Sequence, residues 1–180
     1  MEKNLELTDA QRLILANQYE ILSRLDDSAN ADEYAEVAEQ LRDGHAFLYD
    51  GFLDGVLSDV LDENTVDHVC TTLQLFSTLK DSYEKLSPEE KDTIDKKEVT
   101  FAGFDGNNET DMMLFAQALA KARRFSNTLG ERGDLNSHSP TRDLYGRMIQ
   151  AWKDLDKPHY PLTAEQIRQI VAARIHPSRR

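Results

Sequence analysis

Apolar residues recur at intervals of three and four along most of the chain, the spacing that places them on one face of an α-helix. The longest pattern, at residues 62–86, covers about six helical turns. Shorter patterns of the same kind cover residues 8–25, 30–43, 108–127, 140–155 and 164–175. The sequence therefore predicts an all-α protein, a compact multi-helix array of six or seven helices.

Several predicted helices begin with residues that satisfy free backbone amides at a helix N-terminus. Thr8 and Thr163 are each followed three residues later by glutamine, which is the spacing of a capping box. Ser87 before a proline predicts the start of a short charged helix that ends near residue 97. Ser139 also precedes a proline and is expected to cap the helix at 140–155.

Residues 98–105 are the one apolar segment without helical spacing. Val99 and Phe101 alternate with polar or small neighbours, as they would in a strand. A single strand would have no partner, so we predict an extended connector that buries Val99, Phe101 and Phe104. Residues 46–61 contain two glycines and predict a turn followed by a short helix. We expect one domain over residues 1–180, with two possible helical subdomains at 1–97 and 98–180.

Composition narrows the class of protein. The chain has 180 residues, of which 39% are hydrophobic and 30% are charged, and this suffices for one folded domain. No apolar run approaches the roughly 18 residues that a membrane span needs, and the polar N-terminus has no secretory signal. The single cysteine, Cys70, lies on the stripe of the longest predicted helix and is expected in the core. These features predict a cytoplasmic protein without membrane contact.

Charge is distributed unevenly. The net charge is −12, with a balance of −15 over residues 1–100 and +3 over residues 101–180. The acidic part repels phosphate groups, so any binding of nucleic acid would use the basic C-terminal half. Cations near helix C-termini, such as Arg123 and Arg124, are expected without a ligand. Binding of nucleic acid is therefore the least favoured hypothesis.

Motifs for metal binding or catalysis are missing. Residues 105–116 resemble a calcium loop, but Thr110 and Ala116 stand where glycine and glutamate are required. Asn107 or Asn108 is instead expected to cap the next helix. The acidic run at 50–68 lacks a Glu-x-x-His pair, and no glycine-rich phosphate loop or G-x-S-x-G motif occurs. We therefore expect no metal, no cofactor and no catalytic residues. An enzyme is the less favoured interpretation.

Two segments resemble a known family. Residues 10–19, AQRLILANQY, are similar to the start of the bacterial YfbU family, and residues 99–105 resemble its V-T-F-x-G-F-D signature. Tyr145, Arg147 and Trp152 fit its C-terminal third. The resemblance implies a small, all-helical, cytoplasmic protein. It supplies no catalytic residues, because the activity of that family is uncharacterised.

Polar residues within these motifs are the candidates for ligand binding. They are Arg12, Asn17, Gln18, Asp105 and Arg147. The competing interpretation, which we favour, gives them helix capping, buried hydrogen bonds and ion pairs between helices.

Three hypotheses for function remain at this stage. The first is a non-enzymatic factor that acts through protein–protein contacts, in a regulatory or stress role. The alternative is an enzyme or small-ligand binder with a polar pocket around Arg12, Asp105 and Arg147. The third is a nucleic-acid binder that uses the basic C-terminal half.

Self-association is also predicted from the width of the apolar stripes. Leu75, Tyr145 and Ile149 broaden the stripes of the helices at 62–86 and 140–155 beyond what one contact needs. A homodimer or higher oligomer would cover this excess, with an unidentified protein as another possible partner. The competing account is that the wide stripes form the core of a monomer.

Overall fold

The computed structural model describes residues 6–25, 30–49, 60–130, 134–156 and 160–176. Contacts divide the chain into two compact units, Met1–Val60 and Leu61–Arg180. Six helices in the described ranges have nine or more residues, and no β-strand occurs there. The predicted all-α class is confirmed.

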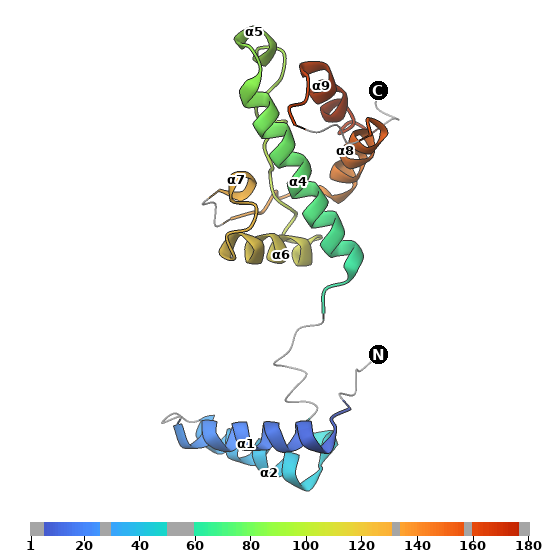
Figure 1. The fold of residues 1–180 in the computed structure, drawn as a ribbon. Helices are drawn as coiled ribbons and strands as arrows, with labels where there is room; N and C mark the ends of the chain where they lie inside the picture. Colours follow the sequence, from blue (N-terminus) through green and yellow to red (C-terminus); the bar gives the residue numbers. More distant parts are fainter. Residues whose placement is uncertain (1–5, 26–29, 50–59, 131–133, 157–159, 177–180) are drawn as a thin grey trace. The chain divides into compact units, whose positions relative to one another are not determined.

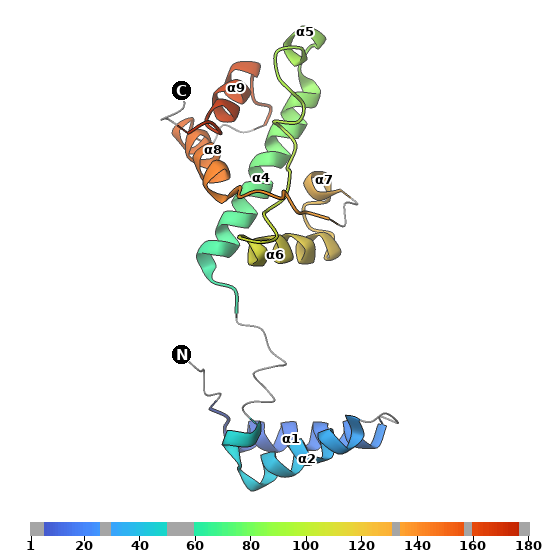
Figure 2. The ribbon, with the colours of Figure 1, turned by 180° about the vertical axis from the view of Figure 1, so that it is seen from behind.

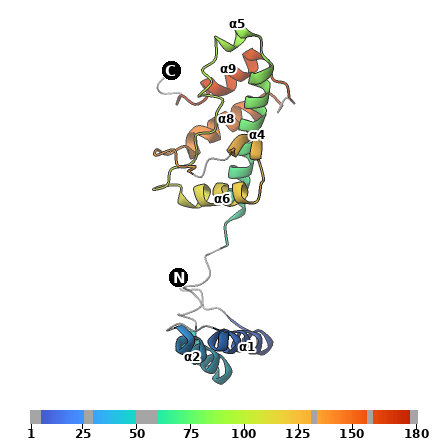
Figure 3. The same ribbon diagram turned by 90° about the vertical axis from the view of Figure 1, so that its left-hand side faces the viewer.

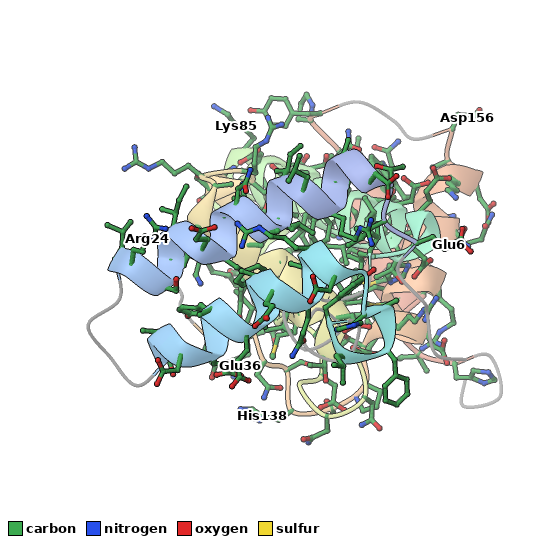
Figure 4. All side chains as sticks on the ribbon, turned by 90° about the horizontal axis from the view of Figure 1, so that it is seen from below. Glu6, Arg24, Glu36, Lys85, His138 and Asp156 are labelled. Atoms are coloured by element: carbon green, nitrogen blue, oxygen red, sulfur yellow. The ribbon has the colours of Figure 1, made fainter. Side chains whose placement is uncertain are left out.

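The first unit is a helical hairpin of α1 (Asp9–Leu25) and α2 (Asn30–Asp43), which lie side by side in Figures 3 and 4. Its small apolar core consists of Ala16, Val37, Leu41 and Tyr49. The predicted capping box opens α1: the Gln11 amide donates to the Thr8 hydroxyl, and the Thr8 amide donates to the Gln11 side chain. The hairpin therefore begins where local sequence predicts.

The second unit is built around the long helix α4 (Glu63–Lys85), which is flanked by further helices on two sides (Figures 1 and 2). The other helices are α5 (Pro88–Lys91), α6 (Thr110–Lys121), α7 (Ser126–Leu129), α8 (Arg142–Asp154) and α9 (Ala164–Ala172). Helices α6, α7, α8 and α9 all contact α4. One core joins residues from Val69 to Val171, so it includes residues on both sides of the predicted division at 97/98.

The wide apolar stripes of α4 and α8 are explained by this core. Leu75, Tyr145 and Ile149 are all buried within the unit. A helix that packs on two sides needs apolar residues over more of its circumference than a surface helix does. The width of these stripes therefore gives no support to self-association.

The connector is confirmed. Val99, Phe101 and Phe104 are buried, and Phe101 packs its ring against those of Phe76, Phe104 and Tyr145 at centroid distances of 5.4–5.7 Å. The Phe104 amide donates to the Leu135 carbonyl at 2.9 Å, and the Phe104 carbonyl accepts from Ser137 at 3.0 Å. This pair of bonds forms an isolated parallel bridge rather than a strand.

Several predicted helix ends are wrong. Helix α8 begins at Arg142 with Thr141 as its N-cap residue, so Ser139 does not cap it. Helix α6 begins after Glu109, not after Asn107 or Asn108. Helices α5, α6 and α9 are shorter than predicted at their C-terminal ends. The start of α8 is bonded by Glu109, a residue 32 positions earlier, which helical spacing does not report.

Two further predictions concern single segments. Cys70 is half-buried, not in the core, and burial raises the pKa of its thiol. Residues 46–49 form a helical turn, whereas 50–59, the rest of the predicted turn and short helix, lie outside the described residues.

Candidate functional site

The five candidate residues are divided between the two units. Arg12, Asn17 and Gln18 lie on α1 in the first unit, and Asp105 and Arg147 lie in the second. The pocket proposed around Arg12, Asp105 and Arg147 therefore draws on residues from both.

Polar groups on α1 pair within the hairpin. The Arg12 guanidinium bonds Asp9 at 2.8 Å, and Asn17 accepts a hydrogen bond from Arg42 at 3.5 Å. Glu20 accepts from both Arg24 and Arg42, and the hydrogen bond and charge of Arg42 lower the pKa of Glu20. Arg12 and Asn17 are therefore each bonded within the hairpin.

Asp105 closes a tight turn at the end of the connector. Its carboxylate accepts from the Asn107 amide at 3.2 Å and from the Asn108 side chain, and its own amide donates to Glu109 at 3.0 Å. The residue is buried. Asp105 therefore holds the backbone ahead of α6.

Glu109 is the buried carboxylate that sequence analysis missed. Its oxygens accept four hydrogen bonds: from the amides of Asp105, Thr141 and Arg142, and from the Thr141 hydroxyl. Thr141 and Arg142 form the start of α8, so the carboxylate takes the place of a local N-cap. Acceptor and helix start are 32 residues apart, and no sequence spacing indicates such a pair.

The glycine of the V-T-F-x-G-F-D signature is required by packing. Gly103 has φ +110°, and a Cβ there would lie 2.0 Å from the Leu135 carbonyl oxygen. Its own carbonyl accepts from the Thr141 and Tyr145 hydroxyls, each at 3.1 Å. Burial raises the pKa of Tyr145 to about 12, so this phenol remains a donor at neutral pH. The signature is therefore accounted for by structure.

Arg147 satisfies the end of another helix. Its Nε donates to the Ala173 carbonyl at 3.1 Å and its Nη2 to the Arg174 carbonyl at 2.5 Å. These carbonyls follow α9, where free acceptors are expected. Arg147 also lines a groove of about 570 Å³ together with Arg142, Arg174 and the acidic Asp143. Asp105 does not line this groove.

Comparison with known proteins identifies the family. A family model described as "YfbU domain" matches residues 5–173. The chain belongs to the YfbU family. It is also similar to UPF0304 protein MJECS11 of Methanocaldococcus jannaschii, at 33% identity over 171 residues, which cover 93% of this chain and 99% of the relative.

The side of α1 that faces away from its hairpin core carries exposed apolar residues. Eight exposed, uncharged residues line it: Ala10, Leu13, Ile14, Asn17, Gln18, Ile21, Leu22 and Leu25. The exposed Gln11 and Arg24 lie on the same side of the helix. We call the set of eight the α1 face. It lies opposite Ala16, the one residue of α1 that is fully buried in the hairpin core. Ile14, Ile21 and Leu25 are 56%, 55% and 74% exposed.

The surroundings of the α1 face are strongly acidic. Residues 1–60 carry 14 acidic and 4 basic side chains, a balance of −10. The exposed side of α2 carries Asp32, Glu33, Glu36, Glu39 and Asp43. Figure 4 shows Arg24 near the end of α1 and Glu36 on the neighbouring α2. A face of exposed apolar side chains without an acidic residue, on so acidic a unit, is suited to contact with protein.

None of the helices in the part of the chain that the structure describes has the length and apolar character to cross a membrane. No group of three or more histidine, cysteine, aspartate or glutamate side chains is placed to hold a metal ion there.

Proposed function

We propose that this YfbU family member is a non-enzymatic, cytoplasmic factor that acts through protein–protein contacts. The observation that carries the proposal is the α1 face, whose large apolar side chains are exposed together on one side of the helix. Exposed apolar patches of this kind on water-soluble proteins mark sites of interaction.

Polar residues of the second unit support the same conclusion. The side chains of Asp105, Glu109 and Arg147 form hydrogen bonds to backbone groups or to neighbouring side chains. A catalytic acid or base needs a group within reach of a substrate. These three groups instead stabilise the ends of helices and turns.

Site-specific photo-crosslinking in living cells tests the proposal. A photoreactive phenylalanine analogue at Gln18, in the centre of the α1 face, should yield covalent adducts with protein upon illumination. The same analogue at Glu36, on the acidic side of α2, is the matched control and should yield few. An absence of protein adducts from position 18 would contradict an interaction function.

A small-anion binder is the second candidate, because three arginines line the groove beside α8. Two of them already have partners, since Arg147 bonds two carbonyls and Arg174 lies 3.6 Å from Glu98. Calorimetric titration with inorganic phosphate tests this candidate. Arg142→Gln should abolish phosphate binding, whereas Arg168→Gln, outside the groove, should preserve it. This pair of results would establish anion binding in place of the interaction function.

The nucleic-acid hypothesis receives less support. Arg168 bonds Glu165 and Thr93, and Arg147 and Arg174 have the partners given above, so these three arginines of the C-terminal half are engaged within their own unit.

A further inference from the structure

We propose that the partner of the α1 face is a second copy of this chain, bound antiparallel about a twofold axis that passes between residues 17 and 18. This inference rests on the proposed interaction function and adds the identity of the partner. It concerns the first unit alone.

The α1 face has an internal symmetry that fits such a pair. In an antiparallel helix pair centred between residues 17 and 18, two residues lie opposite each other when their residue numbers add up to 35. Every member of the α1 face then meets another member of the same face. The pairs are Ala10 with Leu25, Leu13 with Leu22, Ile14 with Ile21, and Asn17 with Gln18.

Side-chain chemistry matches within these pairs. Ile14 and Ile21 lie nearest the centre of the face and are equally exposed, at 56% and 55%. Each would meet the other across the axis, and the leucine pair would flank them. The Asn17 side-chain oxygen already accepts from Arg42, and its NH₂ group can donate to the Gln18 side-chain oxygen of the other copy. An isologous interface requires this kind of self-complementarity.

Side-chain size favours the antiparallel arrangement over a parallel one. Ala10 and Leu25 lie at opposite ends of the face. A parallel pair in register would place alanine on alanine at one end and leucine on leucine at the other, which would splay the helices. The antiparallel pair places one small and one large side chain at each end, so the helix axes keep an even separation.

Charge favours the same face. Two units with a balance of −10 repel each other wherever their acidic surfaces approach. Asp9, Arg12 and Glu20 lie away from the centre of the α1 face, where Arg12 bonds Asp9 and Glu20 bonds Arg24 and Arg42. Arg24 lies beside Asn17 and Ile21 on this side of α1, and in the antiparallel pair it would face Gln11 of the other copy, which is uncharged. The acidic side of α2 also belongs to a different surface of the hairpin. The α1 face is therefore where two copies can approach without like charges in contact.

Analytical ultracentrifugation of the full chain at micromolar concentration tests the proposal. The wild type should sediment with twice the 20.5 kDa mass of one chain. Ile14→Lys and Ile21→Glu should each weaken association at least tenfold, because each inserts unpaired charges at the centre. The double variant Ile14→Lys/Ile21→Glu should restore the dimer, since each lysine would then face a glutamate of the other copy.

Folding is controlled separately in this design. Lysine and glutamate both have good helix propensity, and both positions are exposed in the hairpin, so circular dichroism should match the wild type. Glu39→Lys, on the acidic side of α2, is the charge-change control and should leave the mass unchanged.

Three results would overturn the proposal. They are a wild type that stays at 20.5 kDa, single variants that stay dimeric, and a double variant that stays monomeric. A 20.5 kDa wild type would assign the α1 face to another protein or to the same chain. The interaction function itself would still stand if position 18 crosslinks to a different protein in cells.

Discussion

Glu109 and Thr141 are joined by two hydrogen bonds, from the Thr141 amide at 2.8 Å and from its hydroxyl at 2.9 Å. The same carboxylate accepts from the Arg142 amide at 2.7 Å. A carboxylate at the N-terminus of a helix is stabilised by the free amides and by the helix dipole. Glu109 thereby fixes the start of α8 to the loop that precedes α6.

Replacement of Glu109 by glutamine should lower the free energy of unfolding by about 1–3 kcal/mol. Glutamine keeps one acceptor oxygen but turns an NH₂ group toward backbone donors, so buried amides lose their partners. Urea unfolding measures the change. Asp111→Asn, an exposed change in the first turn of α6, should cost less than about 1 kcal/mol. Equal losses of unfolding free energy for the two variants would show that the buried hydrogen bonds of Glu109 stabilise the protein no more than the exposed Asp111 does.

Gly103→Ala should destabilise the protein by about 2–6 kcal/mol, because it adds backbone strain at positive φ and a clash with the Leu135 carbonyl. Gly146→Ala is the matched control. A Cβ at Gly146 meets nothing within 4 Å, and the residue lies inside α8, so alanine should stabilise by about 0.5–1 kcal/mol. Thermal unfolding should show a lower melting temperature for Gly103→Ala and a higher one for Gly146→Ala. Equal shifts in melting temperature would refute the close approach at Gly103.

Phe101→Ala should cost about 3–5 kcal/mol, the range for a phenylalanine deleted from a core. The side chain contacts three other aromatic rings and lies on a segment with almost no backbone pairing of its own. Leu114→Ala, at an exposed position of α6, provides the comparison and should cost far less. A melting temperature that Phe101→Ala leaves unchanged would mean that the helices alone complete the core.

Acidification should destabilise the second unit through His68. Burial, followed by the charge of Arg142, lowers the pKa of His68 below its ordinary 6.5. The unfolded state therefore binds a proton that the folded state resists. The free energy of unfolding should fall as pH drops through 6.5 toward the lower folded pKa, and no further below it.

The variant His68→Gln isolates this effect from other titrating groups. The difference in unfolding free energy between variant and wild type should shift in favour of the variant between about pH 7.5 and 5. A difference that does not change with pH would rule out a lowered pKa at His68.

Local sequence was enough to predict most helices and three of their caps. Thr8, Ser87 and Thr163 cap their helices as predicted, because donor and acceptor are three residues apart and need no other part of the chain. Burial of the connector was also predictable, since a non-helical segment with two phenylalanines must cover them. Both conclusions depend on periodicity or on side-chain hydrophobicity alone.

Contacts between distant residues were decided by tertiary structure alone. Glu109 caps a helix 32 residues further along the chain, and Arg147 bonds carbonyls 26 and 27 residues away. Ala16 and Leu22 are both apolar residues at helical spacing in α1, yet Ala16 is buried and Leu22 is exposed. The sequence shows how apolar residues are spaced, but which of them become buried depends on where the next helix packs, and that is fixed only when the chain folds.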